Sequence, residues 1–262
     1  MKLSSKKPDG RRSPLITLIL LFALLIILLT IGAMVARRSF LNRGLPSGLP
    51  EPISHSEFQP GINVSLGQYT DNELPETLDQ IRALGFQTVK QSFYYDDSFD
   101  WVASDVLVEA IVASDLMLVP LLDGNPDENF APPDDLAAYA AWVGEFAARY
   151  GDHIDSYIIW DEPNLASHWG NRPVNPAGYA ALLSAAARAI RTADPSAVIV
   201  AAPLAPTVET GGMNLADSLY LRALYRAGAA GAFDVVAGKP YGFDSDPEDR
   251  RVNQDLLNFS RI

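Results

Sequence analysis

The stretch YIIWDEPNLASHWG, residues 157–170, begins as an apolar strand and becomes polar within one residue. Residues 157–160 all favour strands, whereas Asp161 and Glu162 follow them without a spacer. A carboxylate at the end of a buried strand loses hydration, which costs free energy unless the group is paired or lies at an opening of the fold. Two adjacent carboxylates therefore predict a polar site at the end of this strand.

Segments of the same kind recur along the chain on both sides of this stretch. Apolar runs predict six strands, at residues 62–69, 88–95, 116–124, 157–160, 197–206 and 233–243. Helices are predicted between and after them, at about residues 71–84, 101–113, 136–150, 179–190 and 215–227, with a last one from Pro247 onward. Strands rich in Val, Ile and Leu that alternate with helices indicate a parallel sheet covered by helices.

Two architectures fit this alternation: an open doubly wound sheet and a (β/α)₈, or TIM, barrel. The open sheet usually binds a nucleotide through a glycine-rich first turn, but the first turn here, GQYTDNELPE at residues 67–76, lacks that pattern. Barrel enzymes carry catalytic residues at the strand ends, and polar or aromatic residues recur there: Tyr94, Tyr95, Asp123, Asp161, Glu162 and Tyr241. The predicted fold class is therefore α/β of the (β/α)₈ type. Only about six units are present, so we expect a C-terminally truncated barrel over residues 62–262.

The composition argues against several classes of site. The 262 residues include no cysteine, which excludes disulfides and thiolate metal ligands, and the three histidines share no metal-binding spacing. We therefore expect no metal and no organic cofactor. The net charge of −12 makes the body acidic, and an acidic surface repels phosphate, so nucleic acid is not an expected partner. The sequence does not indicate an oligomeric state.

The N-terminal region differs from the rest of the chain in charge and in hydropathy. Residues 1–14 are basic, residues 15–36 form an uncharged apolar run, and residues 37–61 are rich in Pro and Gly and predict a linker. A helix over the apolar run would reach roughly 30 Å, the thickness of the hydrocarbon core. The alternative is a cleaved signal peptide, but its apolar region is about 7 to 15 residues long and ends in a small-residue cleavage site.

We therefore expect an uncleaved membrane anchor. Basic residues flank the apolar run on both sides, with five before it and three closely after it. The positive-inside rule then places the N-terminus in the cytoplasm. The expected localisation is the cell membrane, with a single span and an extracytoplasmic body.

The end of the fourth predicted strand resembles a known family. Trp160-Asp161-Glu162-Pro163-Asn164 is similar to the Trp-Asn-Glu-Pro-Asn that ends this strand in clan A glycoside hydrolases, the (β/α)₈ enzymes that include cellulases, mannanases and β-xylosidases. FDVVAGKPYGF, residues 233–243, is similar to their sixth strand, and the resemblance extends over residues 62–243. It implies hydrolysis of O-glycosidic bonds in an oligo- or polysaccharide, with Glu162 as the general acid/base.

A glutamic acid suits this role chemically. Cleaving a glycosidic bond requires protonation of a poor leaving group while positive charge develops on the sugar ring. A carboxyl group packed against Trp160 and other aromatic rings has little water around it, which favours its protonated form. Adjacent strand residues face opposite sides, so Asp161 and Glu162 share one opening only if the backbone is irregular there. The alternative for Glu162 is a loop carboxylate that caps the next helix.

Two departures from the family pattern bear on activity. Asp161 stands where the family has Asn, and an ionised Asp accepts hydrogen bonds without donating any, which leaves the sugar preference open. The family's nucleophile is a Glu at the end of a seventh strand, and no seventh strand is predicted here; Asp123 and Glu209 follow other strands. We therefore expect this chain to be catalytically incomplete. The alternatives are a non-catalytic carbohydrate-binding or surface-adhesion module on the same barrel and an unrelated open α/β domain.

Six residues around Glu162 are expected to bind the carbohydrate substrate: Trp160, Asp161, Asn164, Trp169, Tyr241 and Asp123. Trp169 either stacks on a sugar face or covers the barrel rim, and Tyr241 either bonds to the nucleophile or substrate or has no such role. Lys239 stands where the family often has His, and a lysine that lines a barrel is expected to pair with a carboxylate.

Overall fold

The computed structural model describes residues 14–41 and 60–246, together with residues 249 and 257. Its strands are β1 (Gly61–Val64), β2 (Thr88–Tyr94), β3 (Met117–Asp123), β4 (Ser156–Ile159), β5 (Val198–Leu204) and β6 (Val235–Gly238). Its α-helices are α1 (Pro14–Leu41), α2 (Leu74–Ala83), α3 (Trp101–Ala113), α4 (Leu136–Tyr150), α5 (Pro176–Ala193) and α6 (Asp217–Arg226). Five single turns of 3₁₀ helix lie in the connections: η1 (Leu66–Gln68), η2 (Pro126–Glu128), η3 (Gly151–His153), η4 (Ala166–His168) and η5 (Ala229–Gly231).

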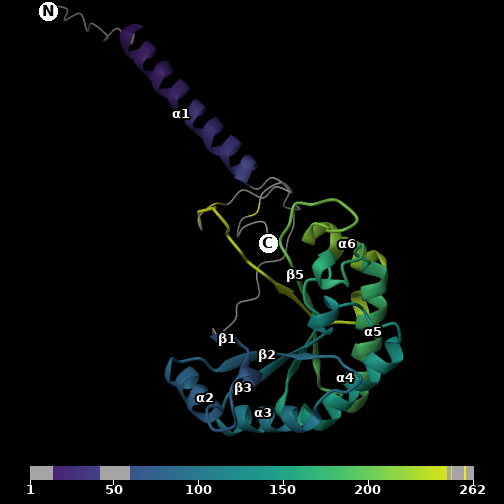
Figure 1. Ribbon diagram of the computed structural model, residues 1–262. Coiled ribbons are helices and arrows are strands. Elements are labelled where there is room, and N and C mark those ends of the chain that lie inside the picture. The colour runs from purple at the N-terminus through teal and green to yellow at the C-terminus, as the bar shows by residue number, and fades with distance from the viewer. Residues whose placement is uncertain (1–13, 42–59, 247–248, 250–256, 258–262) are drawn as a thin grey trace, which may run out of the picture.

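The six strands form one parallel sheet in the order β1-β2-β3-β4-β5-β6. The sheet curls, and helices α2 to α6 lie along its convex side in a crescent (Figure 1). This arrangement is a partial (β/α)₈ barrel, so the predicted fold class and the count of about six units are confirmed.

Apolar side chains pack on both faces of the sheet. The larger cluster lies between the sheet and the helices, where Val89 and Phe93 of β2 meet Val143 and Phe146 of α4, among others. The smaller cluster lines the concave face and centres on Leu121, Ile158 and Val200. These three residues are partners across neighbouring strands.

The register of the concave face places the polar site. Asp123 lies two residues after Leu121 on β3, and Trp160 lies two residues after Ile158, just beyond β4. Since side chains alternate along a strand, Asp123 follows the concave face to its carboxyl-terminal end, whereas Trp160, which lies beyond the strand, packs in the larger cluster. The polar residues predicted at strand ends therefore gather at one rim.

Two predicted elements differ in the structure. The first strand was expected to run to residue 69, but β1 ends at Val64 and the chain turns into η1. The Gln91 side chain explains this end, because its Oε1 accepts a hydrogen bond from the N–H of Leu66 at 2.8 Å and draws the chain out of the sheet. The sixth strand is shorter than predicted, and the helix expected from Pro247 lies outside the described residues, except for isolated positions.

Helix α1 stands apart from the sheet and its helices (Figure 1). Residues Pro14–Arg37 are long and apolar enough to cross a membrane, and none of this segment is buried in the protein. Length and composition alone fit a membrane span or a signal sequence.

Candidate functional site

The backbone at the end of β4 is irregular in the way that the two adjacent carboxylates require. Trp160 has a φ of 71° and Glu162 a φ of 44°, both in the left-handed region that non-glycine residues rarely occupy. Two hydrogen bonds hold this turn: the N–H of Trp160 donates to the carbonyl of Leu122 (3.0 Å), and the N–H of Glu162 donates to the carbonyl of Pro203 (3.1 Å). The turn is therefore tied to β3 on one side and to β5 on the other.

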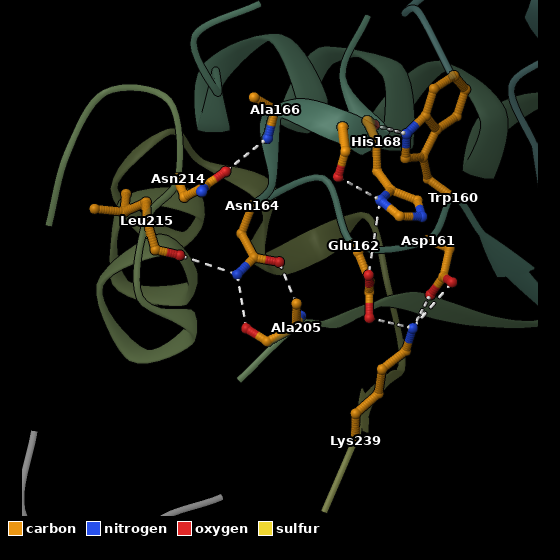
Figure 2. Close-up of polar contacts among 11 residues, drawn as sticks. Trp160, Asp161, Glu162, Asn164, Ala166, His168, Ala205, Asn214, Leu215 and Lys239 are labelled. Carbon is orange, nitrogen blue, oxygen red and sulfur yellow. Dashed lines mark hydrogen bonds and ion pairs between the residues drawn. The ribbon is translucent and has the colours of Figure 1, made fainter. Parts of the chain in front are cut away.

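Asp161 and Glu162 consequently point toward the same side, and Lys239 meets both (Figure 2). The Lys239 Nζ lies 2.9 and 3.0 Å from the two carboxylate oxygens of Asp161 and 2.6 Å from Oε1 of Glu162. All three side chains are largely buried, with 14 to 17% of each exposed. Burial disfavours the charged form of Lys239, but the two carboxylates outweigh it and raise the pKa of the ammonium group. The expected pairing of this lysine with a carboxylate is confirmed, with two partners.

The second oxygen of Glu162 faces His168. Glu162 Oε2 lies 3.7 Å from His168 Nδ1, a distance that is too long for a hydrogen bond. His168 Nδ1 lies 3.1 Å from Ser167 Oγ, and the imidazole stacks on the ring of Phe130 with centroids 4.8 Å apart. Among the described residues, no hydrogen bond reaches Oε2, so this oxygen is the one that a ligand can approach.

Asp123 lies beneath this turn and is only 2% exposed. Burial raises the pKa of Asp123 to about 7, and the negative charge of Asp161 adds to the rise. The backbone N–H groups of Gly124 and Asp161 donate to its carboxylate and oppose the rise, as does the positive charge of Lys90. Asp123 is therefore a buried carboxyl group, beneath the turn, that keeps its proton to a higher pH than an exposed aspartate does.

Both predicted tryptophans are buried. Trp160 packs edge-to-face against Trp169 and against Tyr139, with centroids 5.8 Å apart in each case, and its Nε1 donates to the carbonyl of His168 (3.1 Å). Gly124 leaves room for this indole, since a Cβ there would lie 2.6 Å from the Trp160 ring. The structure thus places Trp160 and Trp169 under the rim, where they support the turn.

Asn164 is also buried, and backbone groups engage its whole amide (Figure 2). Its Nδ2 donates to the carbonyls of Ala205 (2.8 Å) and Leu215 (2.9 Å), and its Oδ1 accepts from the N–H of Ala205 (2.9 Å). Asn164 therefore fastens the loop after β4 to the segment after β5. Tyr241, by contrast, is 52% exposed, and its one aromatic neighbour among the described residues is Phe243, with centroids 6.2 Å apart.

The alternative role of Glu162 as a helix cap does not fit the geometry. The N-cap of α5 is Asn175, whose side chain accepts from the N–H of Gly178, and η4 has no side-chain cap. Glu209, the other carboxylate considered after β5, is exposed and accepts from Nδ2 of Asn214. The structure therefore brings Asp123, Asp161 and Glu162 together and leaves Glu209 on the surface.

Two buried tyrosines at the site have no counterpart in the sequence-based expectations for it. Tyr179 of α5 donates to the carbonyl of Ile159 (2.8 Å) and accepts from the N–H of Ala202 (2.7 Å), while Tyr139 of α4 donates to the carbonyl of Leu122 (2.8 Å). Both hold strand ends where the ladder is interrupted. The only signal in the sequence is a tyrosine within an apolar helix stripe, which is compatible with ordinary core packing.

Within the part of the chain that the structure describes, no cluster of three or more His, Cys, Asp or Glu has the geometry of a metal site. Among the described residues, the rim carries carboxyl groups, the Lys239 ammonium group and the His168 imidazole. Such a set can accept hydrogen bonds from hydroxyl groups of a ligand. Oε2 of Glu162 can exchange a proton with an oxygen atom of the ligand.

Comparison with known proteins supports the fold. No protein-family model and no curated protein matches the chain. Among solved structures, an endo-1,4-β-mannanase from Rhizomucor miehei is 12% identical, with a TM-score of 0.53 and coverage of 72% of this chain and 70% of the mannanase. A glucosidase from Croceicoccus marinus is 16% identical, with a TM-score of 0.50 and coverage of 62% of this chain and 39% of the glucosidase. An exo-β-1,4-mannosidase from Opitutaceae bacterium strain TAV5 is 21% identical, with a TM-score of 0.43 and coverage of 55% and 32%.

The likeness to the mannanase and the glucosidase shows that the chain shares part of the fold of these two proteins, which agrees with the partial (β/α)₈ barrel seen here. The chain spans about a third of the mannosidase and well under half of the glucosidase.

Proposed function

We propose that the chain takes part in hydrolysing O-glycosidic bonds of an oligo- or polysaccharide, with Glu162 as the general acid/base. The observation that carries this proposal is the orientation of Glu162 at the carboxyl-terminal rim. One oxygen is held by Lys239, and the other has no hydrogen bond among the described residues. A proton donor for a glycosidic oxygen needs one such free oxygen.

The neighbouring groups have different parts in this proposal. Asp161 and the exposed Tyr241 are positioned to contact sugar hydroxyl groups, while Asp123, Trp160, Trp169 and Asn164 act beneath them by holding the rim in shape. A single-pass anchor formed by α1, with the body on the extracytoplasmic side, belongs to the same proposal. It is supported by the length and apolar character of Pro14–Arg37.

In the experiment that tests this proposal, added azide serves as the nucleophile. The full chain in detergent micelles is incubated with a phenyl glycoside of mannose or glucose and with azide. Azide attacks the anomeric carbon, and the phenol oxygen leaves with a proton from Glu162, so that a glycosyl azide and phenol are formed. This assay requires no carboxylate nucleophile from the protein.

We expect azide-dependent phenol release, and we expect Glu162→Gln to reduce it by about 100-fold, the scale of general acid catalysis. A 2,4-dinitrophenyl glycoside needs less protonation and should lose much less. Glu128→Gln, a matched change at an exposed glutamate of η2, should have no effect. Equal losses on both glycosides would contradict the acid role.

The second candidate is a non-catalytic carbohydrate-binding module, favoured by the Lys239 contact that takes up one oxygen of Glu162. Binding of manno- or cello-oligosaccharides, followed by tryptophan fluorescence, separates the two. Binding without any azide-dependent release supports the module and overturns the hydrolase. Absence of both binding and release overturns both candidates.

A further inference from the structure

We propose that Lys239 is the positioning residue for Glu162: it holds both carboxylates that follow β4 on one side and leaves Oε2 of Glu162 as the oxygen that meets the substrate. This role rests on the proposed function. It goes further by assigning the orientation of the acid/base to a cation that directly follows another strand, β6, two positions away in the sheet.

The first argument comes from the direction of the side chains. Neighbouring residues in an extended chain face opposite sides, yet Asp161 and Glu162 both lie within 3.0 Å of one nitrogen. Their shared direction depends on two left-handed residues, which are individually unfavourable. A cation between the two side chains offsets the repulsion that this shared direction brings, because without it two like charges would stand side by side in a site with little water.

The second argument comes from the asymmetry of the contacts. Lys239 approaches both oxygens of Asp161 but only one oxygen of Glu162 (Figure 2). Asp161 thus anchors the ammonium group, and the ammonium group in turn fixes Glu162 through Oε1 alone. Oε2 is left on the side of His168, where Phe130 stacks on the imidazole and limits its movement.

The third argument comes from burial. The side chain of Lys239 is 15% exposed, so its charge has few water molecules to pair with and depends on the two carboxylates. Removing the charge leaves Asp161 and Glu162 unpaired and repelling each other. Glu162, which Lys239 contacts through one oxygen rather than two, is then expected to turn toward solvent and carry Oε2 away from the substrate.

The test compares Lys239→Met with Arg82→Met, which removes a cation that pairs with a single carboxylate, Asp115, at an exposed position. In the azide assay on the full chain, K239M should lower release from the phenyl glycoside about 100-fold, the loss expected for a misplaced catalytic group. Release from the 2,4-dinitrophenyl glycoside should fall less than about tenfold, since that reaction needs little proton transfer. K239R, which can still bridge two carboxylates, should recover most of the loss, and R82M should change neither rate.

If Lys239 had a merely structural role, K239M would lower release from both glycosides equally, and that result would overturn the proposal. Equal losses in K239M and R82M would overturn it too. The positioning role and the proposed function fail separately, because a second measurement does not require turnover.

That second measurement is the urea midpoint of unfolding in K239M, D161N and the double variant D161N/K239M. If Lys239 holds the two charges together, K239M leaves the carboxylates of Asp161 and Glu162 repelling each other. Adding D161N removes one of these charges and relieves the repulsion. The double variant should then unfold at a higher urea concentration than the sum of the single effects predicts. Additive midpoints would overturn the positioning role even if the chain proves to be active, and coupling without turnover would support it while the hydrolase proposal fails. If K239M alone does not fold, the double variant, which has one unpaired charge fewer, can still be measured, and its folding would itself show the coupling.

Discussion

Asp123→Asn should remove a loss of stability that the native chain suffers as the pH rises. Asp123 is buried at the end of β3, and folding raises its pKa from 3.8 to about 7, because the buried carboxyl group resists ionisation and lies beside the charge of Asp161. Lys90 and the N–H groups of Gly124 and Asp161 reduce this effect without cancelling it. Asparagine stays neutral at every pH and keeps an oxygen for the N–H of Gly124.

The sign and size of the effect follow from the proton that each state holds. Below about pH 4, the folded and unfolded chains both hold the Asp123 proton, so the group contributes nothing. Between about pH 4 and pH 7 the unfolded chain releases the proton and the folded chain keeps it, so the free energy of unfolding falls by about 1.4 kcal/mol per pH unit. Above pH 7 the loss is complete, at roughly 4 kcal/mol.

The assay is urea unfolding of the full chain in detergent micelles, followed by tryptophan fluorescence from pH 5 to pH 8. The stability of D123N relative to the native chain should rise by about 3 kcal/mol across this range, whatever constant offset the substitution brings. Asp127→Asn makes the same chemical change at an exposed position of η2 and should give a flat difference. Parallel curves for D123N and the native chain would mean that folding does not raise the pKa of Asp123, and would refute the reasoning.

Two further predictions concern the support of the site and the N-terminal helix. Gly124→Ala places a methyl group 2.6 Å from the Trp160 ring and should cost about 1 to 3 kcal/mol in the free energy of unfolding, whereas Gly231→Ala, with no atom within 4 Å, should cost little; equal costs would contradict the packing argument. In cells, the full chain should remain in the membrane fraction after alkaline extraction, keep Met1–Leu15 at its N-terminus, and lose its body to protease added from outside. A mature N-terminus after residue 36, or a protected body, would show that α1 is not an anchor of the proposed orientation.

Most of the scaffold could be predicted from the sequence because its signals are local. Helix α3 has the predicted bounds, Trp101–Ala113, and α4 ends at Tyr150 before Gly151, as its apolar stripe indicates. The end of β1 could not be read in this way. It depends on Gln91, which lies 25 residues further along the chain and bonds to the backbone of Leu66.

The polar rim was predictable in place but not in orientation. The change from Trp160 to Asp161 marks the end of β4, but nothing in the sequence indicates that Trp160 and Glu162 adopt a positive φ. A pairing of Lys239 with some carboxylate could be expected from its position in an apolar strand. That it meets two carboxylates, 77 and 78 residues earlier in the chain, depends on the curl of the sheet.

The backbone and the side chains of the rim are held by different kinds of interaction. Neutral buried groups hold the backbone: Tyr179 bonds to the β4 and β5 ends, and Asn164 bonds to the segment after β5. Among the described residues, the charge of Lys239, which directly follows β6, meets the two carboxylates. Because these two sets of described residues share no hydrogen bond, a change at Lys239 should redirect Glu162 while the turn that carries it stays in place. The orientation of the proposed acid can therefore be varied independently of the fold, and for that reason a loss confined to poor leaving groups would identify Lys239 as a positioning residue.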